Sequence, residues 1–392
     1  MAIRVLGVMT GTSCDGLDAS CVNFSRAGMR LAWSASIAYP DKLRRRVFEF
    51  QLPGASFPLR ACLELHRDLG EWYAKSLIKL LKGRSSQPDA IANHGQTVAH
   101  FPADRRKKGG MTLQLGEAAL IAAATGITTL CGFRAGDLAA GGQGAPLVPI
   151  YHQLLAKLWA KHPGSEPCGI AIHNLGGVSN LTYFGPKNLL LAFDTGPAGL
   201  WIDAAASLAS GGRLHFDHNG SLARRGSSSS DAVKKLITHP FFNKMPPKST
   251  GRDDFPFGLF MAAARGVSGP SLVATATEAV AETIALSYKK WILSRRLPLD
   301  SIYFCGGGAR NSFLLSEIRA RLASSGVRVF STEDRGVDPQ MIEAQAFAYL
   351  GYLSLMGKPL GGAWTGARGF APPAQIVPGK NWRKILKKIQ EL

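Results

Sequence analysis

The chain has 392 residues, of which 46% are apolar and 19% are charged. This composition supports large buried cores and excludes a disordered or fibrous protein, and a typical size of about 150 residues per domain favours two domains. No apolar run reaches the roughly 18 residues that a membrane-spanning helix needs, so we expect a soluble protein with no membrane partner.

The net charge of +19 raises the question of an anionic partner such as nucleic acid. The basic residues fall in short clusters, at residues 42–46, 105–108 and 383–388, without interleaved aromatic residues. We therefore expect solvated surfaces that aid solubility and the capture of anionic substrates, and no nucleic-acid partner.

Six cysteines are scattered along the chain without a C-x-x-C pair. That spacing favours neither a zinc site nor a disulfide scaffold, and a reducing compartment fits best. Residues 1–9 contain too few apolar residues for a signal-peptide core, so we expect a cytoplasmic protein.

The first 24 residues predict a β-hairpin, with an apolar strand at 3–9, a polar turn at 10–16 and an alternating strand at 17–24. Apolar residues at helical spacing then predict a helix over 65–80, followed by a short buried strand at 90–93. Strands alternate with helices, which is typical of the α/β class.

A break at residues 162–167 separates two predicted domains, and beyond it the opening hairpin is repeated. The repeat has a strand at 169–173, a turn at 174–180 and a strand at 181–184. Two domains that begin with the same kind of glycine-rich hairpin predict a duplicated fold with a cleft between the halves.

The expected domains are residues 1–163, joined by a C-terminal helix around 380–392, and residues 164–360. Asp338 and Pro339 stand as N-cap and first residue of a helix that runs to about residue 355. The other elements expected in the second domain are a helix, a strand, a tight turn and a helix, at residues 271–293, 301–305, 306–311 and 312–322.

Three glycine-rich turns, each directly after a predicted strand, let the backbone approach a ligand closely. The first, at residues 11–16, adds hydroxyls and a carboxylate that suit phosphate oxygens and Mg²⁺ held through water, although a plain β-turn has the same composition. The second lies at 174–180 and the third at 306–308. Because α/β folds bind ligands at the carboxyl ends of their strands, the three turns together favour a nucleotide site.

Two carboxylates are candidates for catalysis. Asp194 follows an apolar run and precedes a turn, where a general base would lie, or where an Asp would cap the helix expected to begin near Pro197. Glu343 lies in the first turns of its helix, where the macrodipole alone favours a carboxylate.

Histidine and arginine side chains are candidates for substrate contacts. His94 and His100 are six residues apart, a spacing without metal geometry, so contact with a polar substrate is the better interpretation. Two interpretations of Arg134 stay open: a structural ion pair with Asp137, or bidentate hydrogen bonds that orient a polar substrate.

Ten motifs stand in a fixed order along the chain. They are Gly7-Val-Met-Thr-Gly-Thr-Ser-Cys-Asp-Gly-Leu-Asp18, His94-Gly-Gln-Thr97, Phe133-Arg134 with Asp137, Ala139-Ala-Gly-Gly-Gln-Gly-Ala-Pro-Leu-Val-Pro149, Asn174-Leu-Gly-Gly-Val-Ser-Asn180, Phe193-Asp-Thr-Gly-Pro197, Lys248-Ser-Thr-Gly-Arg252, Cys305-Gly-Gly-Gly-Ala309, Glu343-Ala344 with Ala346-Phe-Ala348, and Thr365-Gly-Ala367. Over nearly the whole chain this series closely resembles the anhydro-N-acetylmuramic acid kinases of bacterial cell-wall recycling. Ten ordered motifs are far more specific than one glycine loop.

The resemblance implies two ribonuclease-H-like domains of the actin-like ATPase type, with an interdomain active-site cleft that closes on ATP and Mg²⁺. Dimerisation is usual in the family, so a homodimer is expected. The implied substrate is 1,6-anhydro-N-acetylmuramic acid, whose anhydro bridge is hydrolysed while the sugar becomes N-acetylmuramic acid 6-phosphate.

The resemblance also assigns roles to residues. Phosphates are implied to lie on Gly11, Thr12, Ser13, Cys14, Asp15, Gly16, Leu17 and Asp18, with Asp15 reaching the metal through water. The second phosphate element is Asn174, Gly176 and Gly177, and the adenosine lies by Gly306, Gly307 and Gly308. Asp194 is implied to be the general base, and the sugar to lie among His94, Gln96, Thr97, Arg134 and Glu343.

The chain departs from the usual family pattern in a few places. Thr10 stands where Ser is usual, Ala198-Gly199 follows Gly-Pro where Gly-Asn is common, and His173 stands where an aliphatic residue is common. Two alternatives stay open beside the resemblance: a kinase of the same superfamily that phosphorylates an ordinary sugar hydroxyl or a carboxylate, and a non-catalytic ATP-dependent regulatory protein.

Overall fold

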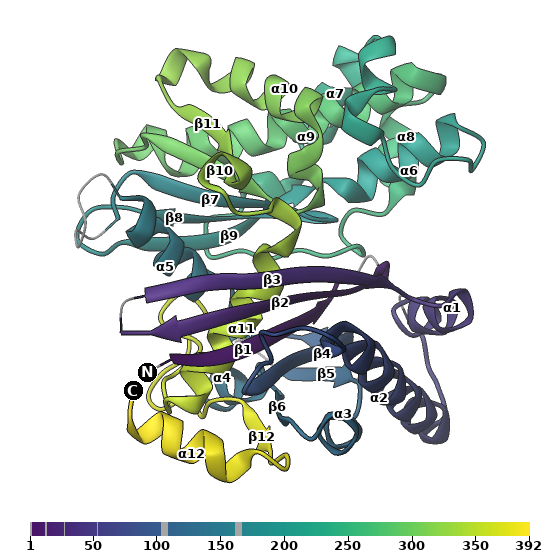
Figure 1. The fold of residues 1–392 in the computed structure, drawn as a ribbon. Coiled ribbons are helices and arrows are strands. Elements are labelled where there is room, and N and C mark those ends of the chain that lie inside the picture. The colour runs from purple at the N-terminus through teal and green to yellow at the C-terminus, as the bar shows by residue number, and fades with distance from the viewer. Residues whose placement is uncertain (1, 12–13, 27, 53, 103–108, 161–166) are drawn as a thin grey trace. The chain divides into compact units, whose positions relative to one another are not determined.

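The computed structural model describes residues 2–11, 14–26, 28–52, 54–102, 109–160 and 167–392. The chain divides into two compact units, each with its own sheet (Figure 1). Unit 1 consists of Met1–Tyr151 and Glu343–Leu392, and unit 2 of His152–Ile342. Among the described residues we find no helix with the length and hydropathy of a membrane span.

Unit 1 is built on a sheet whose strands lie in the order β12-β6-β4-β1-β2-β3, with β5 paired to β4. Strands β1, β2 and β3 are antiparallel neighbours, whereas β4 is parallel to β1 and β6 is parallel to β4. The strands are β1 (Ala2–Thr10), β2 (Gly16–Ser25), β3 (Gly28–Ala38), β4 (Ala90–Phe101), β5 (Met111–Leu115), β6 (Thr128–Cys131) and β12 (Gln375–Val377).

Unit 2 repeats this arrangement with the order β11-β10-β7-β8-β9. Here β7, β8 and β9 are antiparallel neighbours, and β10 and β11 continue parallel to β7. The strands are β7 (Ile170–Leu175), β8 (Val178–Phe184), β9 (Leu190–Pro197), β10 (Ser301–Cys305) and β11 (Arg328–Ser331). Because β3-β2-β1-β4-β6 of unit 1 and β9-β8-β7-β10-β11 of unit 2 share one order and one set of directions, the predicted α/β class and duplicated ribonuclease-H-like fold are confirmed.

Helices cover both faces of the unit 1 sheet. Alternate residues of β1 point to opposite sides of the sheet, and apolar residues on both sides are buried. Val5 shares a core with Leu350 on one side, and Leu6 shares another with Leu69 on the other. The helices of unit 1 are α1 (Asp41–Phe50), α2 (Leu59–Leu81), α3 (Ala118–Thr125), α4 (Ala135–Ala139), α11 (Ile342–Leu355) and α12 (Trp382–Gln390), and α5 (Pro149–Trp159) crosses the boundary between the units.

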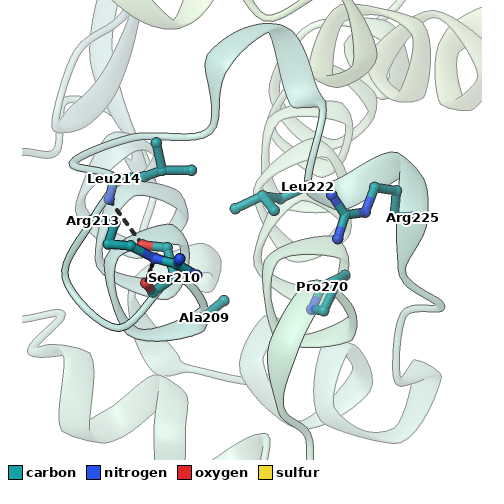
Figure 2. Close-up of a pocket in the computed structure, with 7 residues that line it drawn as sticks. All are labelled: Ala209, Ser210, Arg213, Leu214, Leu222, Arg225 and Pro270. Carbon is teal, nitrogen blue, oxygen red and sulfur yellow. Dashed lines mark hydrogen bonds between the residues drawn. The ribbon is translucent and has the colours of Figure 1, made fainter.

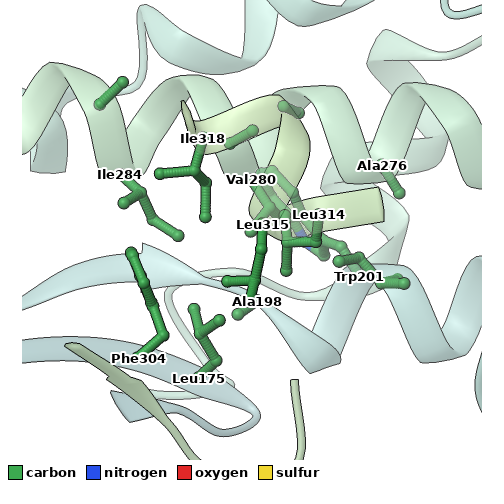
Figure 3. Close-up of a cluster of buried hydrophobic side chains, with 14 of the residues drawn as sticks. Leu175, Ala198, Trp201, Ala276, Val280, Ile284, Phe304, Leu314, Leu315 and Ile318 are labelled. Atoms are coloured by element: carbon green, nitrogen blue, oxygen red, sulfur yellow. The ribbon is translucent and has the colours of Figure 1, made fainter. Parts of the chain in front are cut away.

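Unit 2 has one large core, in which α9 and α10 pack over β7 and β10 (Figure 3). Ile284 of α9 and Ile318 of α10 face Phe304 of β10 in this cluster. The helices are α6 (Gly199–Ala209), α7 (Ser230–Ile237), α8 (Phe257–Ala263), α9 (Gly269–Trp291) and α10 (Ser312–Leu322). Short 3-10 helices lie at His218–Gly220, Ala223–Arg225, Pro240–Asn243, Leu293–Arg295, Gly307–Arg310, Ala323–Ser325, Thr332–Arg335 and Pro339–Met341.

The two units differ in their bounds from the expected domains, in which the second domain runs from residue 164 to residue 360. Unit 2 begins at His152, and the helix expected in the second domain, α11, belongs to unit 1. The reason is packing: α11 lies so close to β1 that a Cβ at Gly7 would fall 1.9 Å from the carbonyl oxygen of Ala344. The C-terminal helix α12 also packs on unit 1, where the Asn381 side chain accepts a hydrogen bond from the Thr128 N–H.

Candidate functional site

The first glycine turn of unit 1 is the β1–β2 hairpin. Its carbonyl at Gly11 accepts a hydrogen bond from the Cys14 N–H at 3.3 Å, and the Asp15 carbonyl accepts one from the Tyr39 N–H at 3.1 Å. A Cβ at Gly16 would lie 2.1 Å from the Ile37 carbonyl oxygen, so only glycine fits there. Thr12 and Ser13, predicted to bind phosphate, lie outside the described residues.

The Gln96 side chain supports this hairpin through two hydrogen bonds. Its amide donates to the Gly11 carbonyl at 3.1 Å and accepts from the Tyr39 hydroxyl at 3.0 Å, and the side chain is fully buried. Both amide atoms are therefore occupied by protein groups. Gln96 therefore supports the first glycine turn, and this arrangement does not favour the predicted contact between Gln96 and a sugar.

The motif His94-Gly95-Gln96-Thr97 lies inside a strand, although we expected the strand to end at residue 93. Strand β4 runs on to Phe101 because residues 96–101 pair with β5. Thr97 is half-buried, and its carbonyl accepts from the Gln51 side chain at 2.8 Å. The local sequence pattern does not show this longer strand, because the extension depends on pairing with residues 111–115 further along the chain.

His94 holds Arg134. The Nδ1 atom of His94 lies 2.8 Å from the Gly95 carbonyl oxygen, which can only accept, so Nδ1 carries the proton. The Nε2 atom then accepts from the Arg134 Nε–H at 3.2 Å. Burial and the Arg134 charge lower the pKa of His94 well below its usual value, which keeps this neutral tautomer in place.

Arg134 and Asp137 both bind the loop at Gly144 and not, in the described contacts, each other. Arg134 Nη1 donates to the Gly144 carbonyl at 3.0 Å, and Asp137 Oδ2 accepts from the Gly144 N–H at 2.7 Å. The Thr365 hydroxyl donates to Asp137 Oδ1 at 2.6 Å. The Asp137 carboxylate thus binds the Gly144 loop and Thr365 and does not pair with Arg134 in the described contacts. This favours the interpretation of Arg134 as a substrate-orienting group.

A charged cluster surrounds the Arg134 guanidinium. Burial lowers its pKa to about 10, against the opposing effect of Glu343, so it stays protonated near neutral pH. Burial and the nearby Asp18 charge raise the pKa of Glu343, while Arg134 lowers it. His100 also lies within the field of Arg134, and burial with that charge lowers its pKa to about 4. In unit 1, Arg134 therefore contacts His94 and lies within the electrostatic influence of Glu343, which also feels the charge of Asp18.

In unit 2 the second and third glycine turns lie together, because β7 and β10 are parallel neighbours and Cys305 pairs with Asn174 at their carboxyl ends. Gly306 has φ 81° and ψ 171°, and a Cβ there would lie 2.4 Å from Asn174 Oδ1. A Cβ at Gly308 would lie 2.8 Å from that of Leu175. Gly307 has open space.

The Gly176 and Gly177 carbonyls cap helix α6. Gly176 O accepts from the Gly199 N–H at 3.0 Å, and Gly177 O accepts from Ala198 at 2.9 Å and Leu200 at 3.0 Å. Ala198, which departs from the family pattern, therefore takes part through its backbone. The second glycine turn is thus fixed to a helix N-terminus by three hydrogen bonds.

Asp194 lies in β9, half-buried, and does not cap a helix. Its Oδ2 accepts from the Thr250 N–H at 2.8 Å, and its own N–H donates to the Lys248 carbonyl at 3.0 Å. Helix α6 has Ala198 at its N-cap, without a side-chain cap. Burial raises the pKa of Asp194 to about 7, although the Thr250 hydrogen bond and the Lys248 charge both lower it. A carboxylate with that pKa can exchange a proton near neutral pH.

His173, where the family has an aliphatic residue, is fully buried behind these elements. It lies 3.0 Å from the Tyr288 hydroxyl and 3.3 Å from Thr195 Oγ1, and burial lowers its pKa to about 3. It is a neutral hydrogen-bonded core residue.

Sequence reasoning missed four supporting residues: Tyr39 and Gln51 in unit 1, and Lys248 and Thr250 in unit 2. No sequence pattern pointed to a role for Tyr39 or Gln51, because both lie far in sequence from the motif that they contact. Lys248 and Thr250 stand in the motif Lys248-Ser-Thr-Gly-Arg252, whose order was noted but whose residues received no role.

A hollow of about 400 Å³ lies elsewhere in unit 2 (Figure 2). It is lined by Ala209, Ser210, Arg213, Leu214, Leu222, Arg225 and Pro270. None of the predicted site residues lines it, so it is separate from the site described above.

Metal-binding side chains do not cluster in the described part of the chain: no three His, Cys, Asp or Glu residues there are placed to hold an ion together. Asp15 is 74% exposed and lies 3.5 Å from Arg44. Carboxylate oxygens have the right chemistry for Mg²⁺, which usually keeps several waters and binds one or two carboxylates plus substrate phosphates. The exposed Asp15 carboxylate is a donor of this chemical type.

Known proteins of one family match this chain over nearly its whole length. A model of the anhydro-N-acetylmuramic acid kinase family matches residues 3–375. A protein named anhydro-N-acetylmuramic acid kinase from Gloeobacter violaceus is 38% identical over 95% of this chain and 98% of its own, and one from Photobacterium profundum is 36% identical over 90% and 92%.

Among solved structures, the activator of the 2-hydroxyisocaproyl-CoA dehydratase from Clostridium difficile with bound ADPNP aligns over 88% of this chain and 93% of its own. Its identity is 13% and its TM-score 0.37, which is too low to carry weight. The family match and the identity of the relatives do carry weight, and they confirm the resemblance and the enzyme class, a kinase. The chain belongs to the anhydro-N-acetylmuramic acid kinase family.

Proposed function

We propose that the chain is an ATP-dependent kinase that hydrolyses the 1,6-anhydro bridge of 1,6-anhydro-N-acetylmuramic acid and yields N-acetylmuramic acid 6-phosphate. Its family and its relatives' names support the substrate. The observation that carries the mechanism is Asp194: a carboxylate held by a backbone N–H, whose burial raises its pKa to about 7.

Asp194 acts as general base in this reaction. The 6-oxygen of the substrate is locked in the bridge to the anomeric carbon and has no proton, so it is a poor nucleophile until the bridge opens. Asp194 takes a proton from a water that attacks the anomeric carbon, and the departing 6-oxygen attacks the γ-phosphoryl group of ATP. One base thus drives both hydrolysis and phosphorylation, and ADP leaves as the second product.

Unit 1 supplies the groups that bind the sugar. Arg134, held by His94 and by the Gly144 carbonyl, presents a protonated guanidinium beside Glu343. A guanidinium held at two points loses little entropy when it binds a carboxylate or a sugar oxygen, and the lactyl carboxylate of the substrate is one such group.

Backbone turns supply the groups that bind the nucleotide. We assign phosphate binding to the hairpin at residues 11–18 and to Gly176 and Gly177, and the adenosine to the face of Gly306, Gly307 and Gly308. Asp15 would hold Mg²⁺ through water, and the ion would neutralise charge on the transferring phosphoryl group. The proposal includes a cytoplasmic homodimer that acts in peptidoglycan recycling.

The decisive assay is incubation with ATP, Mg²⁺ and the anhydro sugar, followed by mass analysis of the product. We expect a combined gain of water and phosphate, with oxygen from labelled water at the anomeric carbon. A kinase of ordinary hydroxyls would instead prefer the ring-opened sugar, and a regulatory protein would give no product.

Asp194→Asn tests the base. We expect a folded protein that still binds ATP and loses at least about 10²-fold in turnover, the usual scale of a positioned base. Near-normal turnover would remove the role assigned to Asp194.

A further inference from the structure

Lys248 is joined to Asp194 through the backbone. The Asp194 N–H donates to the Lys248 carbonyl at 3.0 Å, and two residues later the Thr250 N–H donates to Asp194 Oδ2 at 2.8 Å. The position of the Asp194 carboxylate therefore depends on the path of residues 248–250.

The Lys248 side chain fixes that path from inside the core of unit 2. The residue is 9% exposed, and its ammonium donates to the Phe241 carbonyl at 3.2 Å. The ammonium also lies 4.3 Å from the centre of the Phe241 ring and 5.9 Å from those of Phe193 and Trp291. Aromatic rings at such distances attract a cation, more strongly when it is desolvated. We call these three rings the aromatic cage.

The charges around the cage are mostly positive. Lys244 lies over the Phe241 ring, and Lys290 and Arg295 lie over Trp291. Burial and the Lys290 charge lower the pKa of Lys248 to about 8, while Asp194 raises it. Asp194 is thus the carboxylate whose charge stabilises the caged ammonium, and the effect is mutual.

We propose that Lys248 is a positioning residue for the Asp194 base: its caged ammonium favours the ionised carboxylate, and the segment that it anchors holds that carboxylate in place. This inference rests on the proposed function, because it assigns Lys248 a part in the reaction that Asp194 starts. Lys248 does not touch the substrate in this role and takes no proton from it.

The test is the pH dependence of turnover in Lys248→Met, which keeps the apolar stem and removes the charge. Because the Lys248 charge lowers the pKa of Asp194, its removal raises that pKa, and we expect the acid limb of the kcat profile to move up by about one unit. Turnover at pH 6 then falls about tenfold relative to the unmodified enzyme and recovers toward it by pH 9. Lys248→Arg keeps the charge and should keep the acid limb in place.

Lys290→Met is the matched control, since it removes one positive charge from the same cluster, at a residue whose described contacts are the Trp291 ring and Asn243. Its side chain donates to Asn243 at 2.6 Å, and we expect its acid limb to match that of the unmodified enzyme. If Lys248→Met lowers turnover equally at every pH, or if Lys290→Met shifts the limb as far, the proposed role of Lys248 is wrong.

A second measurement separates this inference from the proposed function. Carbon NMR of labelled aspartate follows the Asp194 carboxyl without substrate, with Asp194→Asn to assign its signal. An unmodified enzyme that makes no product would overturn the function, whereas an unshifted carboxyl titration in Lys248→Met would overturn only the role of Lys248. If Lys248→Met does not fold, an elevated carboxyl titration in Lys248→Gln supports the inference and an unchanged one refutes it.

Discussion

Gly306→Ala perturbs the place where the second and third glycine turns meet. Gly306 has φ 81° and ψ 171°, a region that is essentially restricted to glycine and costs other residues about 1–3 kcal/mol. The new Cβ would also lie 2.4 Å from Asn174 Oδ1 and 2.8 Å from the Leu175 carbonyl oxygen. Overpacking of that kind costs about 1–3 kcal/mol, so the two costs add to about 2–6 kcal/mol. Because the Asn174 side chain can move away and relieve part of the overlap, we expect a total loss of about 3 kcal/mol.

The assay is thermal unfolding together with the KM for ATP. A loss of about 3 kcal/mol lowers the Tm by roughly 6–12 °C in a folding unit of about 150–250 residues. Because Asn174 must move away from the new methyl group, we also expect the KM for ATP to rise about tenfold or more.

Gly307→Ala is the control, one residue away in the same turn. Its Cβ meets no described atom within 4 Å, and we expect a Tm and a KM close to those of the unmodified protein. Equal effects of the two substitutions would refute both the backbone reasoning and the assignment of Asn174 to the phosphate turn.

Three further predictions concern other parts of the two units. The folded pKa of Asp194, about 7, lies above its ordinary value of 3.8, so its stabilising contribution is full below pH 3.8 and is lost as the pH rises through 7. Asp194→Asn should therefore raise the Tm at pH 8 and leave it unchanged at pH 4, and a lower Tm at pH 8 would contradict this. His94→Leu removes the acceptor of Arg134 Nε and should raise the KM for the sugar roughly 5–30-fold, from about 1–2 kcal/mol, with the KM for ATP unchanged. Thr365→Val removes the hydroxyl that donates to the buried Asp137 and should lower the free energy of urea unfolding by about 1–3 kcal/mol; no change would show that Asp137 is satisfied otherwise.

The strand-turn-strand openings of both units could be predicted because their signals are local. A run of apolar residues marks β1, apolar alternation marks β2, and glycines mark the turns between strands. The same holds for β10 (Ser301–Cys305) and α10 (Ser312–Leu322), whose predicted and observed bounds agree.

Pairings between distant segments could not be read from local pattern. Helix α11 is apolar over most of its surface, so its sequence does not show which sheet it covers. Gln96 stands in a motif beside His94 and Thr97, and only the contacts from Tyr39 and Gly11 show that it supports the hairpin. The raised pKa of Asp194 likewise depends on burial that three-dimensional packing creates.

The two-part makeup of unit 1 bears on how the protein is made. One side of its sheet, at Ile3 and Val5, is covered by Phe347, Leu350 and other residues that follow Ile342. A growing chain on the ribosome thus has all of unit 2 before it has the residues that finish unit 1. Unit 1 is therefore synthesised first but completes its core last. A nascent chain halted at Ile342 would lack the side chains that cover Ile3 and Val5, and this apolar surface would be accessible to chaperones and proteases.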